Sequence, residues 1–440
     1  MKRYNSYKDS GVEWIGEVPI HWKVLRLKFA YIFKTGATPS SGKKEYYGGD
    51  FKWANIGDLT SKYVDDTAKH ITKEAISSCS MTINPIGTLM YSFKLSVGTV
   101  AFCSDEMYSN EAIASFIPQK NNLDYLYYAA PVFIIHNSNR NIYNAPILNQ
   151  DLIKNAIICL CPKYEQEQIA SYLDTKCGEV DKVISTQEKR VALLQELKQS
   201  IITNAVTKGL NPDVKMKDSG IEWIGEVPEH WVIMRVKDLL RLLTDYDANG
   251  SFADIAKNCN INNGNPYAWM VRATDLENNR IGIVDGNNYC DKKTYEYLSK
   301  SSLSENDILL AKRGDIGKSY LVPFCNDPMT LAPNTYLLLT DKKKVNNKCL
   351  FYYFQSYVGA EILRLLNKST TLGALYKDDV KSINVPIAPL LEQQEIASYL
   401  DKRCAQIDAS ISKAKKEIEL LQEYKQSLIT EVVTGKRKVC

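Results

Sequence analysis

The side chains that could perform catalysis are few and form no motif. The chain has four histidines, and two of them, His21 and His230, stand in repeated His-Trp pairs, for which we predict a structural role. Residues 212–215 read Pro-Asp-Val-Lys, part of a nuclease acid-x-lysine signature, but no strand pattern flanks them. No GxxxxGK[ST] loop and no Asn/Asp-Pro-Pro-aromatic tetrapeptide is present. The sequence therefore predicts no catalytic residue.

A metal site is not predicted either. Eleven cysteines are scattered along the chain without a CxxC pair, and zinc sites need closely spaced Cys and His ligands. Unpatterned cysteines are typical of reduced thiols in the cytosol. No apolar run approaches the roughly 18 residues of a membrane helix. We expect a cytoplasmic protein that spans no membrane and binds no metal or cofactor of its own.

Polar and basic side chains gather in loops where they could contact DNA. In the first half the candidates are Lys43, Lys44, Tyr47, Lys52, Ser92, Lys94, Asn139, Arg140, Asn141 and Tyr143. In the second half they are Arg272, Lys312, Arg313, Lys318, Asn367 and Lys368. Such side chains read base edges, and Lys and Arg also hold phosphates. The net charge of only +4 means that binding would use local patches. The alternative interpretation is that these are ordinary solvated loops.

The elements that carry these loops belong to a tandem duplication. Residues 8–22 (KDSGVEWIGEVPIHW) recur almost unchanged at 217–231, and EQEQIASYLD at 165–174 recurs as EQQEIASYLD at 392–401. LLQELKQSIIT at 193–203 recurs at 420–430. The period is far too long for a solenoid repeat. The segments between the repeats have diverged, which indicates one scaffold with two specificities.

Each copy ends in a long helix, predicted at 163–209 and 390–440. Apolar residues recur every seven positions over four to five heptads, for example at Leu400, Ile407 and Leu421, which is typical of a coiled coil. A helix of about 40 residues spans roughly 60 Å. We predict that the two helices pack antiparallel and act as a ruler, with a pseudo-two-fold axis relating the halves. The alternative is that each helix packs on its own domain.

The diverged segments have mixed patterns, so we predict an α+β fold for the domains at 1–162 and 210–389. Strands are predicted at 99–102, 113–117, 281–284, 319–322 and 336–340, and helices at 123–135 and 349–366. Tyr91–Gly98 corresponds weakly to Leu310–Gly317.

This arrangement resembles the specificity subunits of type I restriction–modification systems, which have two target recognition domains separated by two long repeated helical regions. The sequence segments that carry this resemblance are KDSGxEWIGEVPxHW, EQxxIASYLD, LLQExKQSxIT and VVTGKRK, together with Thr35-Gly-Ala-Thr-Pro39. The second half lacks the last motif and reads Thr244-Asp-Tyr-Asp-Ala248 there.

The resemblance implies a non-catalytic subunit that reads double-stranded DNA, one domain per half of a bipartite, asymmetric site. It implies two methyltransferase subunits that bind S-adenosylmethionine and methylate adenine. Two restriction subunits that use ATP and Mg²⁺ would join them for cleavage. Two equal partners need two equal docking surfaces, for which the candidates are the repeated helix residues Gln166, Ser171, Gln195, Lys198 and Gln199. The alternative is a solvated helix face.

Two other functions stay open from the sequence. One is a DNA methyltransferase or nuclease with fused recognition domains, which the missing motifs disfavour. The other is a coiled-coil scaffold whose two domains bind proteins. Salt-dependent binding to DNA, tighter for one bipartite sequence, distinguishes the scaffold from the specificity subunit.

Overall fold

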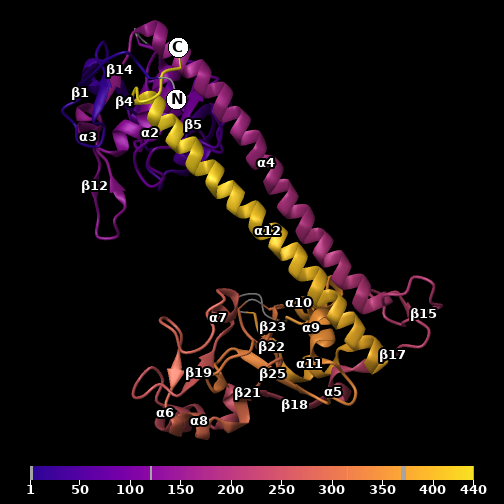
Figure 1. The fold of residues 1–440 in the computed structure, drawn as a ribbon. Coiled ribbons are helices and arrows are strands. Elements are labelled where there is room, and N and C mark those ends of the chain that lie inside the picture. Colours follow the sequence, from indigo (N-terminus) through magenta and orange to yellow (C-terminus); the bar gives the residue numbers. More distant parts are fainter. Residues whose placement is uncertain (1–2, 119–120, 315, 368–372, 440) are drawn as a thin grey trace. The chain divides into compact units, whose positions relative to one another are not determined.

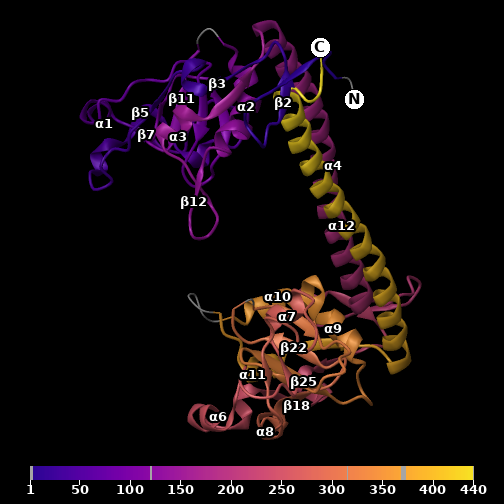
Figure 2. The ribbon, with the colours of Figure 1, turned by 60° about the vertical axis from the view of Figure 1, so that its left-hand side comes forward.

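The computed structural model describes residues 3–118, 121–314, 316–367 and 373–439. The chain divides into two compact units (Figures 1 and 2). Unit 1 comprises Met1–Gln187 and Lys416–Cys440, and unit 2 comprises Glu188–Lys415. No helix in the described ranges is long and apolar enough to cross a membrane.

Unit 1 is built on a five-stranded sheet whose strands follow the order β4-β11-β8-β9-β6. Its central strands β8 and β11 are buried along their whole length because both faces of the sheet are covered. The bounds are β4 Phe33–Thr35, β6 Tyr63–Val64, β8 Leu89–Ser92, β9 Val100–Cys103 and β11 Ile113–Phe116. A second sheet contains β5 Tyr47–Ala54, β7 His70–Ile71 and β10 Tyr108–Ser109. Three strand pairs are β1 Tyr7–Asp9 with β2 Glu17–Pro19, β3 Lys23–Arg26 with β14 Ile157–Leu160, and β12 Asn139–Arg140 with β13 Pro146–Ile147. Helices are α1 Lys73–Ser78, α2 Leu123–Ile135, α3 Gln150–Asn155 and the short η1 Leu27–Phe29, η2 Lys44–Tyr46 and η3 Ile56–Asp58.

Unit 2 repeats this plan with a four-stranded sheet of order β18-β25-β22-β23. The bounds are β18 Leu240–Asp245, β22 Ile308–Ala311, β23 Ser319–Leu321 and β25 Thr335–Thr340. The second sheet contains β19 Ala268–Val271, β20 Tyr289–Cys290, β21 Ser302–Leu303 and β24 Met329–Leu331. Two strand pairs are β15 Met216–Asp218 with β16 Glu226–Pro228, and β17 Val232–Arg235 with β26 Asn384–Ile387. Helices are α5 Val236–Leu239, α6 Phe252–Asn258, α7 Ala273–Glu277, α8 Lys292–Tyr297, α9 Asn347–Gln355, α10 Tyr357–Leu365, α11 Lys377–Ser382, η4 Tyr246–Asn249 and η5 Ser299–Ser301.

The two units therefore share one α+β fold, as predicted. Strands β4, β11, β8 and β9 correspond in order to β18, β25, β22 and β23. In the second sheets, β5 pairs parallel with β10, and β19 pairs parallel with β24. The matched strands place the turn after β8 and the turn after β22 at the same point of the fold.

Two long helices, α4 Lys163–Lys208 and α12 Leu390–Val433, run through both units. In unit 1, Leu428 near the end of α12 shares the core with Leu173 near the start of α4. In unit 2, Ile202 near the end of α4 shares the core with Leu400 near the start of α12. Each unit thus has the end of one long helix and the start of the other in its core.

The repeated opening segment holds the first turn of each long helix. In unit 1, the Trp22 indole donates a 2.9 Å hydrogen bond to Glu165, and His21 Nε2 lies 2.6 Å from the same carboxylate. In unit 2, Trp231 and His230 make the equivalent contacts with Glu392, at 3.2 and 2.8 Å. The predicted structural role of the two repeated histidines is confirmed.

Two predicted elements are wrong in detail. Residues 281–284 form no strand but bend at 282–283, where Gly282 has a φ of +86° and Ile283 N–H donates to the Asp327 carboxylate at 2.8 Å. The helix predicted at 349–366 is two helices, α9 and α10. Ser356 separates them with extended backbone, and its hydroxyl caps Gly359 N–H at 3.1 Å.

Candidate nucleic-acid interface

A cationic turn follows the inner strand β8 in unit 1 and the inner strand β22 in unit 2. In unit 1, Ser92 N–H donates to Thr99 O at 2.8 Å and Val97 N–H donates to Leu95 O at 2.7 Å. In unit 2, Ala311 N–H donates to Lys318 O at 3.0 Å and Ile316 N–H to Gly314 O at 2.8 Å. These bonds join corresponding positions, so the described residues of the two turns share this hydrogen-bond pattern.

Each of these turns presents one exposed cation at the same position. Lys94 is exposed in unit 1, and its nearest carboxylate is that of Glu111, at 3.8 Å. Arg313 occupies the position in unit 2, is exposed, and takes part in no ion pair among the described residues. A cation with little or no internal pairing can hold a phosphate or donate to a guanine.

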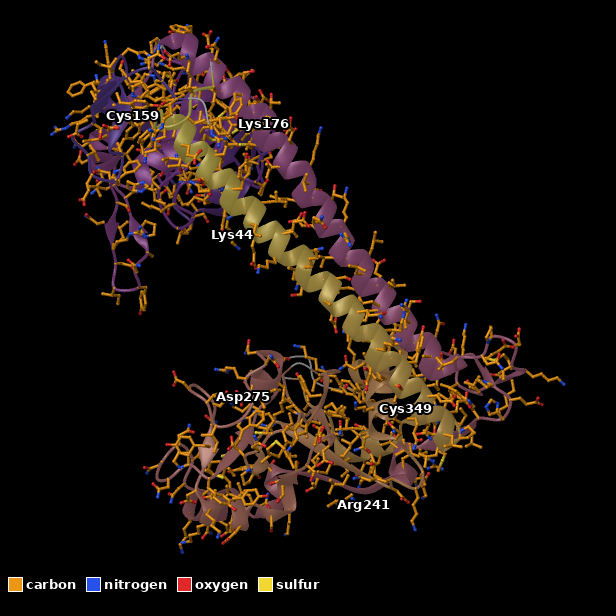
Figure 3. The ribbon with its side chains drawn as sticks, in the orientation of Figure 1. Lys44, Cys159, Lys176, Arg241, Asp275 and Cys349 are labelled. Atoms are coloured by element: carbon orange, nitrogen blue, oxygen red, sulfur yellow. The ribbon has the colours of Figure 1, made fainter. Side chains whose placement is uncertain are left out.

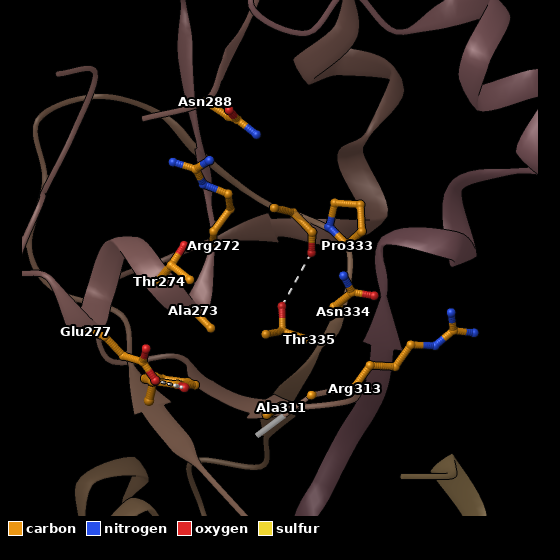
Figure 4. Close-up of a pocket in the computed structure, with 13 residues that line it drawn as sticks. Arg272, Ala273, Thr274, Glu277, Asn288, Ala311, Arg313, Pro333, Asn334 and Thr335 are labelled. Atoms are coloured by element: carbon orange, nitrogen blue, oxygen red, sulfur yellow. Dashed lines mark hydrogen bonds between the residues drawn. The ribbon is translucent and has the colours of Figure 1, made fainter. Parts of the chain in front are cut away.

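Arg313 borders a cavity of about 460 Å³ in unit 2 (Figure 4). Figure 4 shows Asn334 and Arg313 on one side of it and Thr274 and Glu277 on the other. The cavity is also lined by Asn288. Amide, hydroxyl and guanidinium groups on one concave surface can exchange hydrogen bonds with base edges.

Two predicted contact residues beside this cavity are held by carboxylates inside unit 2. Lys312 Nζ lies 2.8 Å from Asp245 and 2.6 Å from Asp247. Burial lowers the pKa of Lys312, but the hydrogen bonds to these two carboxylates outweigh it and the pKa lies above its ordinary value. Arg272 donates to Asp275 at 2.7 Å, and this aspartate is fully buried. Asp275 lies in α7 and is labelled in Figure 3. Both cations therefore position loops.

Asp245, the last residue of β18, lies where unit 1 has Thr35, the last residue of β4, because Tyr336 and Ala114 pair with them at matching positions. Gly36 follows Thr35 directly. The pKa of Asp245 lies below the ordinary value, because hydrogen bonds from Lys312 and Lys377 outweigh the opposing effect of burial. In unit 1, Gly36 packs so closely on Ser109 that a Cβ would lie 1.6 Å from the Ser109 carbonyl oxygen. The same loop is thus held by ion pairs in one unit and by close backbone packing in the other.

Two of the remaining candidates of unit 2 form an ion pair or a hydrogen bond within the unit. Lys318 is exposed and lies 2.8 Å from Glu277. The Asn367 side chain accepts a hydrogen bond from Ala374 N–H at 3.2 Å. Lys368 lies outside the described residues.

In unit 1, four candidates lie in strand β5 or just before it. Lys43 and Lys44 are exposed, and Lys43 donates to Tyr46 OH at 3.0 Å. Tyr47 OH donates to Pro39 O at 2.7 Å, and Lys52 lies 2.7 Å from Asp105. Lys43 and Lys44 are therefore the more accessible cations of this cluster.

The β12–β13 hairpin extends from the body of unit 1 (Figures 1 and 2). The Asn141 side chain accepts hydrogen bonds from Tyr143 N–H and Ala145 N–H, both at 2.9 Å, and Arg140 donates to Asn144 O at 3.1 Å. Asn139 is exposed beside them, and Tyr143 is 83% exposed at the tip. The polar residues shape the turn, and the tip presents an aromatic ring.

Two residues predicted to lie at contact surfaces are buried, so these two predictions are wrong. The side chain of Ser92 is fully buried, and its hydroxyl donates to Lys94 O at 3.1 Å, so it supports the turn and cannot reach DNA. Gln166 is 1% exposed. It accepts from Asn122 N–H at 3.0 Å and donates to Cys161 O at 2.8 Å, so it cannot dock a partner. Gln393 makes the equivalent bonds in unit 2, which explains why this glutamine repeats.

The other predicted docking residues lie at or near the surface of the long helices. Ser171 and Gln195 are exposed. Lys198 is partly engaged, with an ion pair to Asp408 at 2.7 Å, and Gln199 donates to Gln355 O at 2.8 Å. The repeat residues Lys425 and Asp181 form the same ion pair in unit 1, at 2.7 Å. In the described parts of the chain, no group of three or more His, Cys, Asp or Glu side chains is placed to hold a metal ion.

The chain thus contains two copies of one fold, each with a cation at the same position of a matching turn. The family model of the type I restriction modification DNA specificity domain matches residues 19–193 and 228–420, and the chain belongs to this family. The resemblance inferred from the repeats is confirmed.

Relatives of similar length carry specificity-subunit names. The chain is 24% identical to the type I restriction enzyme MjaIX specificity subunit of Methanocaldococcus jannaschii, covering 97% of this chain and 95% of that one. It is 21% identical to the EcoBI specificity subunit of Escherichia coli, over 80% of this chain and 75% of that one. A solved structure from a study of assembly and conformational transition of the type I R-M system shares the fold. Its TM-score is 0.69 at 14% identity, over 94% of this chain and 98% of that chain.

Proposed function

We propose that the chain recognises a bipartite, asymmetric DNA sequence and directs its partners to it, with one half-site read by each unit. The observation that carries this proposal is the shared cationic turn in different surroundings. Lys94 stands beside Leu95 and Glu111, whereas Arg313 stands beside Asn334 and an open cavity. One scaffold that presents two chemically different surfaces is what an asymmetric target requires.

We also propose that α4 and α12 pack as an antiparallel coiled coil that sets the distance between half-sites. Contacts in unit 1 support this: Asp181 pairs with Lys425, and Gln187 donates to Glu417 at 3.1 Å. Positions along α12 decrease as positions along α4 increase, which is the antiparallel sense. Domains on one face of B-DNA read half-sites about one turn, roughly 34 Å, apart.

Catalysis would belong to partner subunits. We propose two methyltransferase subunits carrying S-adenosylmethionine, and two restriction subunits using ATP and Mg²⁺, in the cytoplasm. Ser171 and Gln195 are the exposed repeat residues best placed to contact the two methyltransferase subunits. Equal surfaces on repeated helices suit two equal partners.

The decisive experiment begins with a genome-wide map of methylated adenines in cells that express the chain with its methyltransferase partner. The complex is then bound to the mapped site, to versions with either half scrambled, and to random DNA at several salt concentrations. We expect tight binding only to the intact site, and weaker, strongly salt-dependent binding to random DNA. Equal affinity for all these DNAs would overturn sequence recognition. Methyl transfer by the chain without partners would overturn its non-catalytic role.

A further inference from the structure

Leu95, beside Lys94, has an unusual backbone conformation. Its φ is +57°, in the left-handed region that a branched side chain adopts only at a cost, whereas the corresponding residue of unit 2 is Gly314, with a φ of +80°. Hydrogen bonds of the two turns match, as described above. Glycine is therefore the residue that this turn favours, and unit 1 carries a leucine in its place.

Packing within unit 1 does not compensate for this cost. The Leu95 side chain is 92% exposed and belongs to none of the apolar clusters of the described residues. A strained residue that gains nothing from its own fold is an indicator of function. Lys94 next to it supplies a cation that can approach a phosphate.

We propose that Leu95 is a specificity-determining residue that contacts the 5-methyl group of a thymine in the major groove of the half-site read by unit 1. An apolar side chain contacts thymine through this methyl group, which no other base carries in DNA. Gly314 has no side chain to make such a contact, so the same turn reads its half-site differently. This inference rests on the proposed function.

The test replaces each thymine of the half-site with uracil, which lacks only the methyl group. The complex of the full chain with its methyltransferase partner is used, and the relevant half-site is the one at which Lys94→Ala weakens binding. For the wild-type complex, one replacement should weaken binding about fourfold, the effect of burying one methyl group. Leu95→Gly and Leu95→Asn should weaken binding to the thymine site similarly and be insensitive to that replacement.

Three controls separate contact from folding. Both variants tolerate a positive φ, so their melting temperatures should not fall. Leu95→Met, which keeps an apolar side chain, should retain sensitivity to uracil. Leu391→Asn, at another exposed leucine, should behave as wild type.

Several results would overturn the inference. One is a half-site that contains no thymine. Another is a wild-type complex whose binding is unchanged by every thymine-to-uracil replacement. A third is a Leu95→Gly complex whose binding weakens on replacement as much as that of the wild type. Enhanced fluorescence of 2-aminopurine next to the contact, lost in Leu95→Gly, would show insertion between bases instead of a methyl contact. Failure of the wild-type complex to prefer its mapped site would instead reject the proposed function itself.

Discussion

The indole of Trp22 donates a 2.9 Å hydrogen bond to the carboxylate of Glu165, 143 residues later in the chain. This bond joins two of the repeated segments of the first half, and Trp231 with Glu392 does the same in the second. The repeated segments therefore persist together because they form one joint between the opening of each half and its long helix.

The contacts of Glu165 and Glu392 predict that matched substitutions of these two residues reduce the free energy of unfolding by different amounts. The Glu165 side chain is 3% exposed and that of Glu392 is 25% exposed. Glu165→Gln should cost about 1.5–3 kcal/mol, because a charged hydrogen-bond acceptor is lost in a buried place, and Glu392→Gln should cost less. Urea unfolding monitored in each unit by hydrogen exchange measures both. Glu167→Gln, on the exposed face of α4, is the control, and equal costs at 165 and 392 would contradict the prediction.

The same joint predicts a dependence on pH. Burial raises the pKa of Glu165, but hydrogen bonds from Trp22, His21 and Tyr164 outweigh it, and the pKa lies below its ordinary value. The carboxylate therefore stabilises the fold fully above its unfolded pKa of about 4.3, and this contribution disappears as pH falls through the lower folded pKa. We expect the stability difference between wild type and Glu165→Gln to shrink in that acidic range. A stability difference between wild type and Glu165→Gln that grows on acidification would contradict this prediction.

The cationic turns predict selective losses of DNA binding. Lys94→Ala should weaken recognition of one half-site and Arg313→Ala that of the other, each by about 1–3 kcal/mol, without loss of stability. Lys312→Ala is the contrasting variant. It leaves Asp245 and Asp247 without this cation and should lower the melting temperature of unit 2. Binding to DNAs with one altered half-site measures the selectivity, and equal losses at both half-sites would reject the assignment.

Gly36 predicts a steric effect at the motif Thr35–Pro39. A Cβ there would lie 1.6 Å from Ser109 O, so Gly36→Ala should destabilise unit 1 by about 1–3 kcal/mol or more. Gly57→Ala is the matched control, since no heavy atom lies within 4 Å of the added Cβ. Thermal unfolding compares the two, and an unchanged melting temperature for Gly36→Ala would show that the loop can move away.

The proposed spacer predicts a change in target length. One heptad added to both α4 and α12, at the level where Gln187 meets Glu417, lengthens each helix by about 10 Å. The gap between half-sites should grow by about three base pairs while both half-sites stay the same. Methylation mapping reads the gap directly, and an unchanged gap would show that the helices do not set it.

The amino-acid sequence by itself determined the duplication, the two long helices, the α+β class and the family. These follow from repetition and from the periodicity of nearby residues, which are visible without the fold. It also located both cationic turns, because Lys94 and Arg313 stand in segments that still correspond.

Only the tertiary structure decided which polar residues are accessible. Ser92 and Gln166 were expected at the surface but are buried, and Lys312 is held by Asp245, 67 residues away. Leu95 gave no signal in the sequence, because its strain appears only as a backbone angle in a turn shared with Gly314. Burial, ion pairing and backbone strain depend on partners far away in the chain, so no local pattern reveals them.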